Sequence, residues 1–339
     1  MTARSVSELA IRSYTPADGA GIVDLWDRSI GDRYPLSEDV LRQCLDRNPS
    51  FLPGDALVAL DDGRPVGFAY LGRYRVAAPE TLERRRRAWL QAVVVDASWR
   101  RHGVGRSLVA QLARPLLHEG VERVGAGGGS FYFWPGFPED LPWAWPFGEA
   151  LGFERPEPTW DLRGDVRALD ERAAQSTLDR AGLRLAPASA LDRADLLAFL
   201  FREFGAEWWH ETAWFLDEGG DPADLQLLRD PATNDSIIGM ARLHTPATRP
   251  IGPPHFWAAR RSASAGGLGP IGVAQARRGH GLGLALLTVA LARLRDQGLF
   301  DVVIDFTTLL GFYGHLGFEP WMSFRQASVP THRLIDAGG

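Results

Sequence analysis

Apolar residues recur at four-residue steps in two stretches that lie far apart in the chain. This spacing places one apolar side chain per turn on the same face, which predicts two amphipathic helices. A glycine follows each stretch, at Gly120 and at Gly298, as is typical of a helix end. The apolar positions are Val104, Leu108, Leu112 and Leu116 in the first stretch, and Leu282, Leu286, Ala290 and Leu294 in the second.

Short apolar runs flank both predicted helices and indicate buried β-strands. Residues 90–95 and 268–273 precede the helices, and residues 121–125 and 300–306 follow them. Further upstream, each half contains two more apolar runs that a turn separates, as in a β-hairpin. These runs are residues 56–60 and 66–71 in the first half, and residues 225–228 and 237–243 in the second.

The segment between strand and helix occurs twice in the same register. Residues 95–105 read Val-Asp-Ala-Ser-Trp-Arg-Arg-His-Gly-Val-Gly, and residues 273–283 read Val-Ala-Gln-Ala-Arg-Arg-Gly-His-Gly-Leu-Gly. Each half closes on Leu-Gly-Phe-Glu, at residues 151–154 and 316–319. Self-similarity on this scale predicts two tandem domains. We place the first domain at residues 1–165, a helical linker at 166–182 and the second domain at 183–339.

Composition and charge narrow the range of functions. The chain has 339 residues, enough for about two domains, and its single cysteine excludes an intrachain disulfide framework. All 37 basic residues are arginines, which excludes phosphate loops, kinase sites and Schiff bases that need a lysine. A net charge of -5 argues against a nucleic-acid partner. The spacing of the histidines does not favour a metal site.

Hydropathy bears on the location of the protein. No apolar stretch approaches the roughly 20 residues of a membrane-spanning helix, and the first residues lack the charged-then-apolar order of a secretory signal. We therefore expect a cytoplasmic protein without membrane association, as a monomer or a homodimer.

The repeated Arg-x-x-Gly-x-Gly segment predicts an anion-binding turn. Glycines allow a sharp turn and a close approach of a ligand, while the first amides of the helix point outward without partners inside the helix. An adjacent arginine, either of Arg100 and Arg101 or either of Arg277 and Arg278, can add a charged contact. A dinucleotide-dependent oxidoreductase is disfavoured, because neither copy has the third glycine of that fingerprint.

The order strand, Arg-x-x-Gly-x-Gly, long helix, strand, short helix and Leu-Gly-Phe resembles the GNAT N-acetyltransferase superfamily over nearly the whole chain. The resemblance implies an α/β (α+β) fold of two tandem GNAT-like domains, each a mixed twisted sheet flanked by helices. It also implies acetyl-CoA as the cofactor, with the pyrophosphate on the glycine loop and the pantetheine arm along the preceding strand. The implied contacts are Ile271, Gly272, Val273, Arg278, Gly279, His280, Gly281, Leu282 and Gly283 in the second half, and Val93, Val94, Val95, Arg100, Arg101, Gly103, Val104 and Gly105 in the first.

The family often uses a tyrosine before Leu-Gly-Phe to protonate the departing thiolate. Tyr313 holds this position in the second half, whereas Gly148 is its counterpart in the first, so we expect catalysis in the second half. The resemblance leaves the general base open between Asp305, at the end of the following strand, and the group of Glu207, His210 and Glu211. An asparagine that many members carry after that strand is replaced here by Phe306-Thr307-Thr308.

Two aromatic stretches bear on the acceptor, which we expect to be a small-molecule primary amine. Residues 131–147 suit a core or an interface, because several prolines make this stretch rigid. The second stretch suits an amine or a sugar ring, since aromatic faces lie beside polar groups. Tandem members of the family act on amino sugars and their conjugates, so an amino sugar is one expectation. The residues of the second stretch expected at the acceptor are Glu207, Trp208, Trp209, His210 and Glu211.

The alternative to an N-acetyltransferase is a non-catalytic acyl-CoA-binding protein in which both halves have lost turnover. Tyr313 argues for retained chemistry in the second half. The first half is then expected to bind the cofactor with weak or no catalysis.

Overall fold

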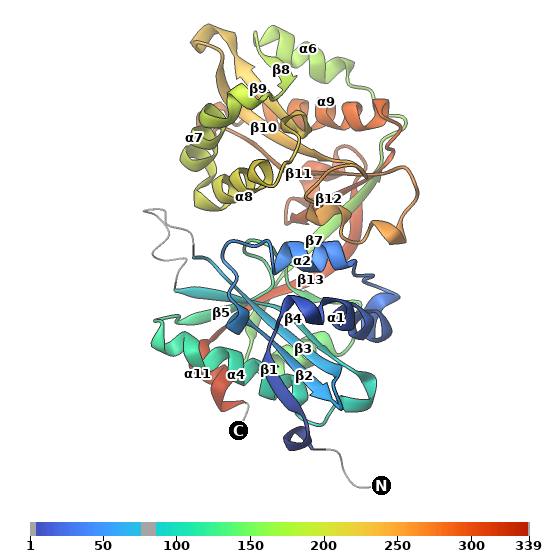
Figure 1. Ribbon diagram of the computed structural model, residues 1–339. Helices are drawn as coiled ribbons and strands as arrows, with labels where there is room; N and C mark the ends of the chain where they lie inside the picture. Colours follow the sequence, from blue (N-terminus) through green and yellow to red (C-terminus); the bar gives the residue numbers. More distant parts are fainter. Residues whose placement is uncertain (1–4, 76–85, 338–339) are drawn as a thin grey trace. The chain divides into compact units, whose positions relative to one another are not determined.

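A computed structural model describes residues 5–75 and 86–337 of the chain, which form two compact units (Figure 1). Unit 1 contains the described residues up to Thr159 and those from Met322 onward. Unit 2 runs from Trp160 to Trp321. The units therefore follow the two sequence halves except at the end of each half.

Unit 1 contains a sheet in the order β1-β2-β3-β4-β5-β13, with β6 paired to β13. All of its pairings are antiparallel except the parallel pair β4 and β5. The strands are β1 (Ala10–Ser13), β2 (Ala56–Asp61), β3 (Arg64–Arg73), β4 (Arg87–Val95), β5 (Arg123–Ala126), β6 (Phe137–Pro138) and β13 (Glu319–Pro330).

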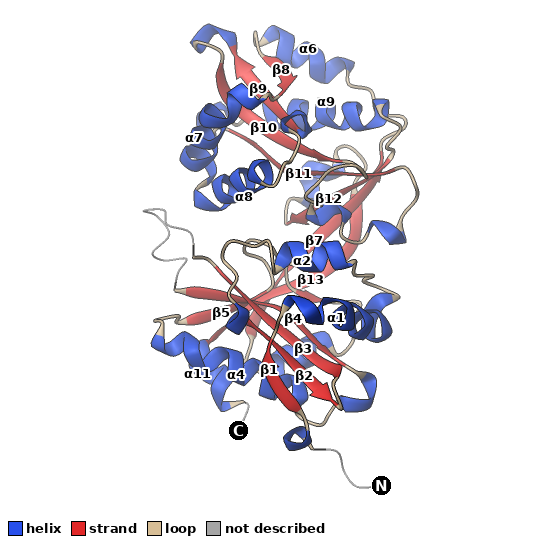
Figure 2. Cartoon of the chain, viewed as in Figure 1, coloured by secondary structure: helices blue, strands red, loops and turns tan. Residues whose placement is uncertain are grey.

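Helices cover both faces of this sheet (Figure 2). Helix α4 carries the four-residue apolar pattern of the sequence and buries Leu108, Leu112 and Leu116 in one core, where α11 contributes Leu334. Because these side chains share one face, the helix can cover the sheet while its other face stays polar. The helices are α1 (Gly19–Trp26), α2 (Glu38–Cys44), α4 (Val104–His118), α5 (Ala144–Ala150) and α11 (Thr331–Asp336).

Unit 2 repeats this plan with strand order β7-β12-β11-β10-β9-β8. Its single parallel pair among the described strands is β11 and β12, which matches β4 and β5 of unit 1. The strands are β7 (Glu154–Asp165), whose part from Trp160 onward lies in unit 2, β8 (Arg184–Pro187), β9 (Leu225–Asp230), β10 (Ser236–His244), β11 (Ala265–Val273) and β12 (Asp301–Thr307).

The helices of unit 2 bury two separate cores, one on each face of the sheet. Helix α9 lies in the larger core and is apolar almost all round, with Leu286 and Leu291 fully buried. Helices α7 and α8 form the other core around Phe199 and Phe215. The helices are α6 (Arg172–Arg180), α7 (Arg193–Phe204), α8 (Ala206–Asp217), α9 (Leu282–Asp296) and α10 (Leu310–Gly314).

The two units exchange their last strands. Strand β7 follows the Leu-Gly-Phe-Glu of the first half, yet it pairs with β12 of unit 2, with Arg163 opposite Val303. Strand β13 follows the Leu-Gly-Phe-Glu of the second half and pairs with β5 of unit 1, with Ser328 opposite Gly125. Figure 1 shows β13, coloured as part of the C-terminal end, in the sheet of unit 1.

The exchange changes the domain boundaries expected from the repeat. The segment from Met322 onward belongs to unit 1 and not to the second domain at 183–339, because its strand completes the first sheet. The expected helical linker is part of unit 2, where α6 buries Leu178 in the core beneath α9. Glu171 just before α6 also pairs with Arg295 of α9 at 2.7 Å.

Candidate active site

In both units the parallel strand pair separates partway along its length. Strands β4 and β5 pair from Arg87 to Leu90 of β4. Beyond Leu90, β4 continues to Val95 without pairing to β5. Strands β11 and β12 pair from Ala265 to Gly267, and β11 continues to Val273. Backbone amides and carbonyls along the separated part are then open to a ligand strand or chain. The predicted cofactor residues Val93 to Val95 and Ile271 to Val273 lie on these separated parts.

A glycine in the left-handed region connects each separated strand to its long helix. Gly103 has φ of 83° and Gly281 has φ of 74°, and among the described residues no side chain caps either helix. A β-carbon on Gly279 or on Gly281 would meet no atom within 4 Å, so the space in front of these first-turn amides is open. Both turns therefore fit the diphosphate of a nucleotide cofactor.

The arginine of each motif holds the turn against its strand. Nε of Arg100 donates to the carbonyl of Val95 at 3.1 Å, and Nε of Arg278 donates to the carbonyl of Val273 at 3.1 Å. Because the same bond occurs in both units, we assign this arginine first to the shape of the loop. In unit 1 a further guanidinium nitrogen of Arg100, Nη2, donates to the carbonyl of Ser29 at 3.2 Å.

Unit 1 has a cavity of about 470 Å³ at its glycine turn. Trp143 and Phe147, from the first aromatic stretch, line the cavity, and the guanidinium of Arg100 lies 4.8 Å from the centre of the Trp143 ring. The structure thus brings all predicted cofactor residues of the first half to one place. They are Val93, Val94, Val95, Arg100, Arg101, Gly103, Val104 and Gly105.

The earlier part of the same aromatic stretch packs in the core of unit 1. Phe133 is 2% exposed, and the ring of Trp134 stacks on Trp26 with the ring centres 4.9 Å apart. The stretch therefore divides between core and cavity wall.

In unit 2, Tyr313 and Asp305 lie close enough to influence each other. Tyr313 is 6% exposed, and burial followed by the charge of Asp305 raises the pKa of its hydroxyl to about 12. A hydrogen bond with Thr307 opposes this rise. The hydroxyl therefore keeps its proton at neutral pH, as a general acid must.

Asp305 faces an irregular point of the separated strand β11. A β-carbon built on Gly269 would lie 3.0 Å from Oδ1 of Asp305, so the carboxylate covers this glycine. The register between β10 and β11 shifts here, and Gly269 has φ of 149°. Nε2 of His244 donates to the carbonyl of Gly269 at 2.6 Å, which fixes the backbone at this point.

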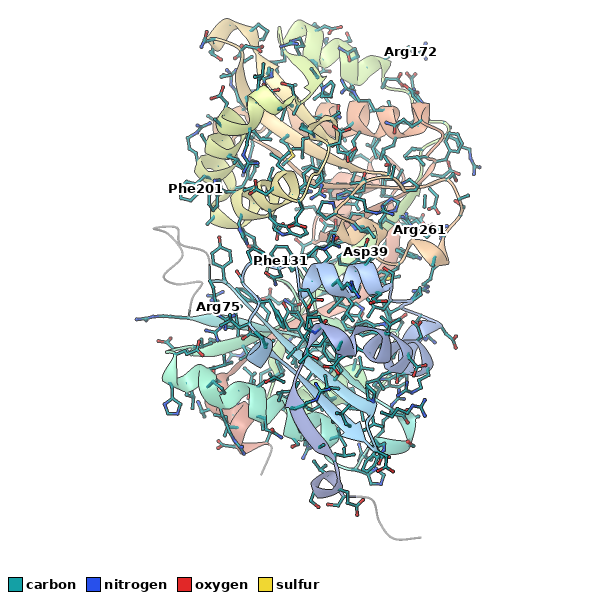
Figure 3. The ribbon with its side chains drawn as sticks, in the orientation of Figure 1. Asp39, Arg75, Phe131, Arg172, Phe201 and Arg261 are labelled. Carbon is teal, nitrogen blue, oxygen red and sulfur yellow. The ribbon has the colours of Figure 1, made fainter. Side chains whose placement is uncertain are left out.

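The predicted acceptor residues lie along α8, with different surroundings. The Trp208 ring stacks on Phe204 with the ring centres 4.2 Å apart, and both rings lie against Gly272 of β11. Trp209 instead contacts Phe201, which is labelled in Figure 3. Of the predicted group, Trp208 therefore lies against the strand that is expected to hold the cofactor.

The remaining predicted acceptor residues are polar. Glu207 lies in the first turn of α8, where the helix dipole favours a carboxylate. His210 is buried, and burial lowers its pKa to about 4, so the ring is neutral at pH 7. Glu211 lies within electrostatic range of Arg242 on β10.

Arg242 is a site residue that the sequence reasoning missed. Its guanidinium is 3.8 Å from the centre of the Phe215 ring, and burial lowers its pKa to about 10. The negative charges of Asp224, Glu211 and Asp305 oppose this lowering of the pKa of Arg242. A single charged residue within the apolar run 237–243 was the signal that could have revealed it.

Comparison with known proteins identifies the family. The model of the acetyltransferase (GNAT) family matches residues 21–128 and again residues 193–318. The chain belongs to the GNAT acetyltransferase family. It is a tandem GNAT protein, which confirms the fold class expected from the sequence, and it is an N-acetyltransferase.

Individual relatives resemble the chain over most of its length. A mycothiol acetyltransferase from Nocardia farcinica is 27% identical over 289 residues, which cover 79% of this chain and 81% of that protein. A tandem GNAT protein from the clavulanic acid biosynthesis pathway has a TM-score of 0.61 at 17% identity, over 96% of this chain and 99% of that chain.

A glucosamine N-acetyltransferase region of a fungal multi-domain β-N-acetylglucosaminidase shares the fold over 97% of this chain, with a TM-score of 0.84 and 23% identity. The present chain spans only 38% of that longer chain.

The two GNAT units differ at the predicted catalytic positions. By the strand registers, Gly127 of unit 1 is the counterpart of Asp305. Alignment of the two Leu-Gly-Phe segments makes Gly148 the counterpart of Tyr313. Neither glycine has room for a side chain. A β-carbon on Gly127 would lie 2.2 Å from the carbonyl oxygen of Trp134, and one on Gly148 would lie 2.7 Å from the ring of Phe137.

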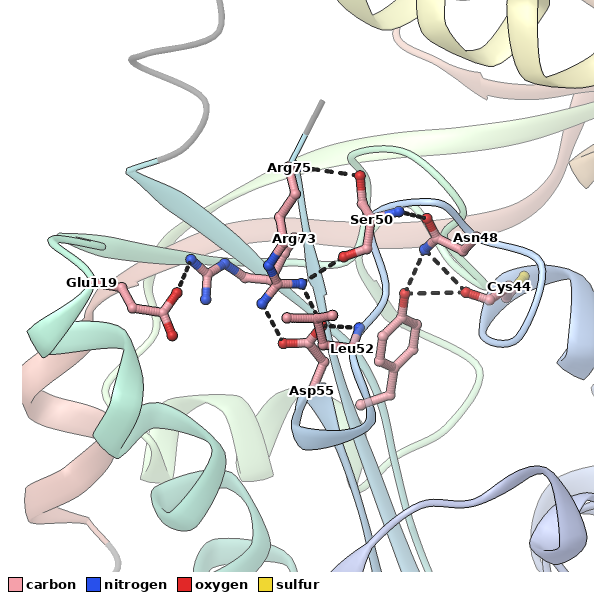
Figure 4. Close-up of polar contacts among 9 residues, drawn as sticks. Cys44, Asn48, Ser50, Leu52, Asp55, Arg73, Arg75 and Glu119 are labelled. Atoms are coloured by element: carbon pink, nitrogen blue, oxygen red, sulfur yellow. Dashed lines mark hydrogen bonds and ion pairs between the residues drawn. The ribbon is translucent and has the colours of Figure 1, made fainter. Parts of the chain in front are cut away.

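Strand β3 of unit 1 carries different residues at the positions where β10 of unit 2 carries Arg242 and His244. Tyr70 is the counterpart of Arg242, and it is hydrogen-bonded to Cys44 and Asn48, which Figure 4 labels. Its hydroxyl donates to the carbonyl of Cys44 at 3.2 Å and accepts from Asn48 at 3.1 Å. Unit 1 thus holds a neutral, internally bonded tyrosine where unit 2 has a buried cation.

The counterpart of His244 is Gly72, and its space is filled by Gln91. Nε2 of Gln91 donates to the carbonyl of Gly128 at 2.7 Å, and so this side chain bridges the two separated strands of unit 1. Gln91 is 1% exposed and lines the cavity. The inner end of the unit 1 cavity is therefore narrowed by an amide side chain.

Proposed function

We propose that this GNAT enzyme transfers an acetyl group from acetyl-CoA to a primary amine of a small molecule, with the active site in unit 2. The observation that carries the proposal is the presence of Tyr313 and Asp305 beside the separated strand β11. At both counterpart positions unit 1 has glycines whose side-chain space is already filled. Unit 1 is then a site that binds the cofactor and does not turn it over.

The residues of unit 2 fit the roles that the transfer requires. When bound, acetyl-CoA supplies an activated acetyl group as a thioester. The amides after Gly281 are placed to hold its diphosphate, and the edge of β11 from Ile271 to Val273 is placed to pair with the pantetheine arm. Asp305 is placed to take a proton from the amine, and Tyr313 to give one to the thiolate.

An amino sugar is the acceptor class that we favour. Relatives named for mycothiol acetylation and for glucosamine N-acetylation support this choice. A second cavity, of about 300 Å³, has His244, Thr245, Thr248 and Ser262 among its lining residues. Hydroxyl and imidazole groups around a space of this size suit the hydroxyls of one sugar ring.

Thiol release from acetyl-CoA over a panel of amines tests the proposal. The panel includes glucosamine, a glucosamine conjugate, a polyamine and an aromatic amine, and we expect turnover with the amino sugars. Tyr313→Phe is the active-site variant, and Phe312→Leu on the same helix is its matched control. If the whole panel gives no thiol, or if Tyr313→Phe is as active as the control, the assignment of chemistry to unit 2 is wrong.

A further inference from the structure

Asp161 is a buried carboxyl group that the first half of the sequence supplies to unit 2. It lies on β7, the exchanged strand, and is 5% exposed. The backbone amide of Phe306 donates to its Oδ1 at 2.9 Å. The pairing of β7 with β12 is irregular at this point, since the register shifts between Ile304 and Thr307. Asp161 therefore stands opposite the bulge that contains Asp305.

The charged groups around Asp161 come from two neighbouring segments. The charge of Asp305, on β12, and the charge of Arg261, in the loop before β11, both influence the pKa of Asp161. Arg261 is labelled in Figure 3. Burial first and then Asp305 raise the pKa of Asp161 to about 8, while the amide of Phe306 and the charge of Arg261 oppose the rise. At neutral pH Asp161 thus keeps its proton beside the charge of Asp305.

Asp305 in turn faces the other groups of the site. Its charge acts on Arg242 of β10 and on Tyr313 of α10, and its Oδ1 covers Gly269 of β11. Unit 1 has no counterpart of this pair, because the corresponding positions hold Gly127, directly after β5, and Gln326 of β13. The carboxyl pair is therefore specific to the unit in which we place the chemistry.

We propose that Asp161 is a positioning residue for the acetyl transfer, and that it forms with Asp305 a paired carboxyl site that holds the acceptor as an ammonium ion and takes its proton. This inference rests on the proposed function and deepens it. Asp305 is the member that touches the acceptor, and Asp161 acts through Asp305. The acceptor is thus recognised as a cation, and the carboxyl pair provides the charge that attracts it.

The proton balance of the transfer closes with these groups. The ammonium gives one proton to the Asp305 carboxylate, which later releases it to water. The neutral amine forms a bond to the acetyl carbon, and the bond from that carbon to sulfur breaks. Tyr313 protonates the leaving thiolate and regains a proton from the nitrogen, which must lose its second proton when it becomes an amide. The products are the acetylated amine, coenzyme A and one proton.

A carboxyl group of this kind should lower the stability of the fold. An unfolded aspartate has a pKa of about 3.9, whereas Asp161 in the folded unit has a pKa of about 8. Between these values the folded protein binds the additional proton, so the free energy of unfolding falls as pH rises through this window and levels off above pH 8. A residue kept for structure alone would stabilise the fold.

Thermal unfolding of the full chain tests this point. Asp161→Asn should raise Tm relative to the wild type, with a gain that is small near pH 4 and grows up to about pH 8. Asp165→Asn is the matched control, because Asp165 is exposed on the same strand, and its effect on Tm should not change over this range. A lower Tm for Asp161→Asn at every pH would overturn the proposal.

Kinetics supply the second test. Above about pH 8 the wild-type site gains the charge of Asp161, so KM calculated for the ammonium form of the acceptor should fall as pH rises. Asp161→Asn should remove this dependence and lower kcat/KM by about tenfold above pH 8, where Asp161 is charged in the wild type, against about 10²-fold for Asp305→Asn. An unchanged pH dependence in Asp161→Asn would refute the positioning role. If no amine is acetylated, the proposed function fails, while the unfolding experiment still reports on Asp161.

Discussion

The ring of Phe137 lies so close to Gly148 that a β-carbon on this glycine would come within 2.7 Å of the ring. Gly148 is the counterpart of Tyr313, so the space that unit 2 gives to a tyrosine side chain is given in unit 1 to packing. The difference between the units thus extends beyond a single substitution to the neighbouring side chains. Unit 1 keeps the glycine turn and lacks counterparts of Tyr313 and Asp305.

Replacing Tyr313 by phenylalanine should lower kcat by about 10²-fold, because the thiolate loses its proton donor. The affinity for acetyl-CoA should stay unchanged, since the hydroxyl is not part of the glycine turn. Calorimetry and steady-state kinetics measure the two quantities separately. Because the pKa of Tyr313 is raised to about 12, its ionisation should cause no loss of wild-type activity up to pH 10.

The glycine turns of the two units can be tested against each other. Gly281→Val should abolish cofactor binding in unit 2 and with it turnover, because valine disfavours the positive φ and fills the space before the first-turn amides. Gly103→Val should remove only the unit 1 site. We expect calorimetry to give two cofactor sites in the wild type and one in each variant. Equal loss of turnover in both variants would show that unit 1 also catalyses or supports the reaction.

Introducing a tyrosine at Gly148 should not create a second active site. The side chain would collide with Phe137, and overpacking of this kind costs about 1–3 kcal/mol. We expect Gly148→Tyr to lower the free energy of unfolding, measured by urea denaturation, without a gain in turnover. The double variant with Phe137→Ala relieves the collision and should recover part of the stability. A gain in turnover in either variant would contradict our account of unit 1.

Arg242→Met should destabilise unit 2 and impair the acceptor site. The change removes the buried positive charge that acts on Asp224, Glu211 and Asp305, and it removes the contact between the guanidinium and the Phe215 ring. Chemical denaturation measures the loss. Arg202→Met, on the exposed face of α7, is the control and should change stability little.

Much of the fold could be predicted from the sequence because its signals are local. The motif, the helix that follows it and the strands on either side are each encoded in short runs of residues. The same holds for Tyr313, which precedes Leu-Gly-Phe in a recognisable order. The sharp glycine turns were likewise predicted, and in them Gly103 and Gly281 have positive φ.

The exchange of strands and the residues that depend on it could not be predicted in this way. Strand β7 begins with charged residues and prolines, at Pro156 and Pro158, which conceal its pairing capacity. Its partner β12 lies far along the chain, and no local pattern specifies which of two similar sheets a strand will join. Asp161 was missed for this reason, since the repeat assigns it to the first domain.

The path of the chain also affects the order in which the protein can fold during synthesis. A ribosome makes the first 159 residues of unit 1 well before the segment from Met322 onward that completes its sheet. Until that segment emerges, β5 lacks the neighbour with which it pairs in the native sheet and presents an open edge. Unit 2 already has β7 when its own strands appear, so the unit that begins first is the last to be finished.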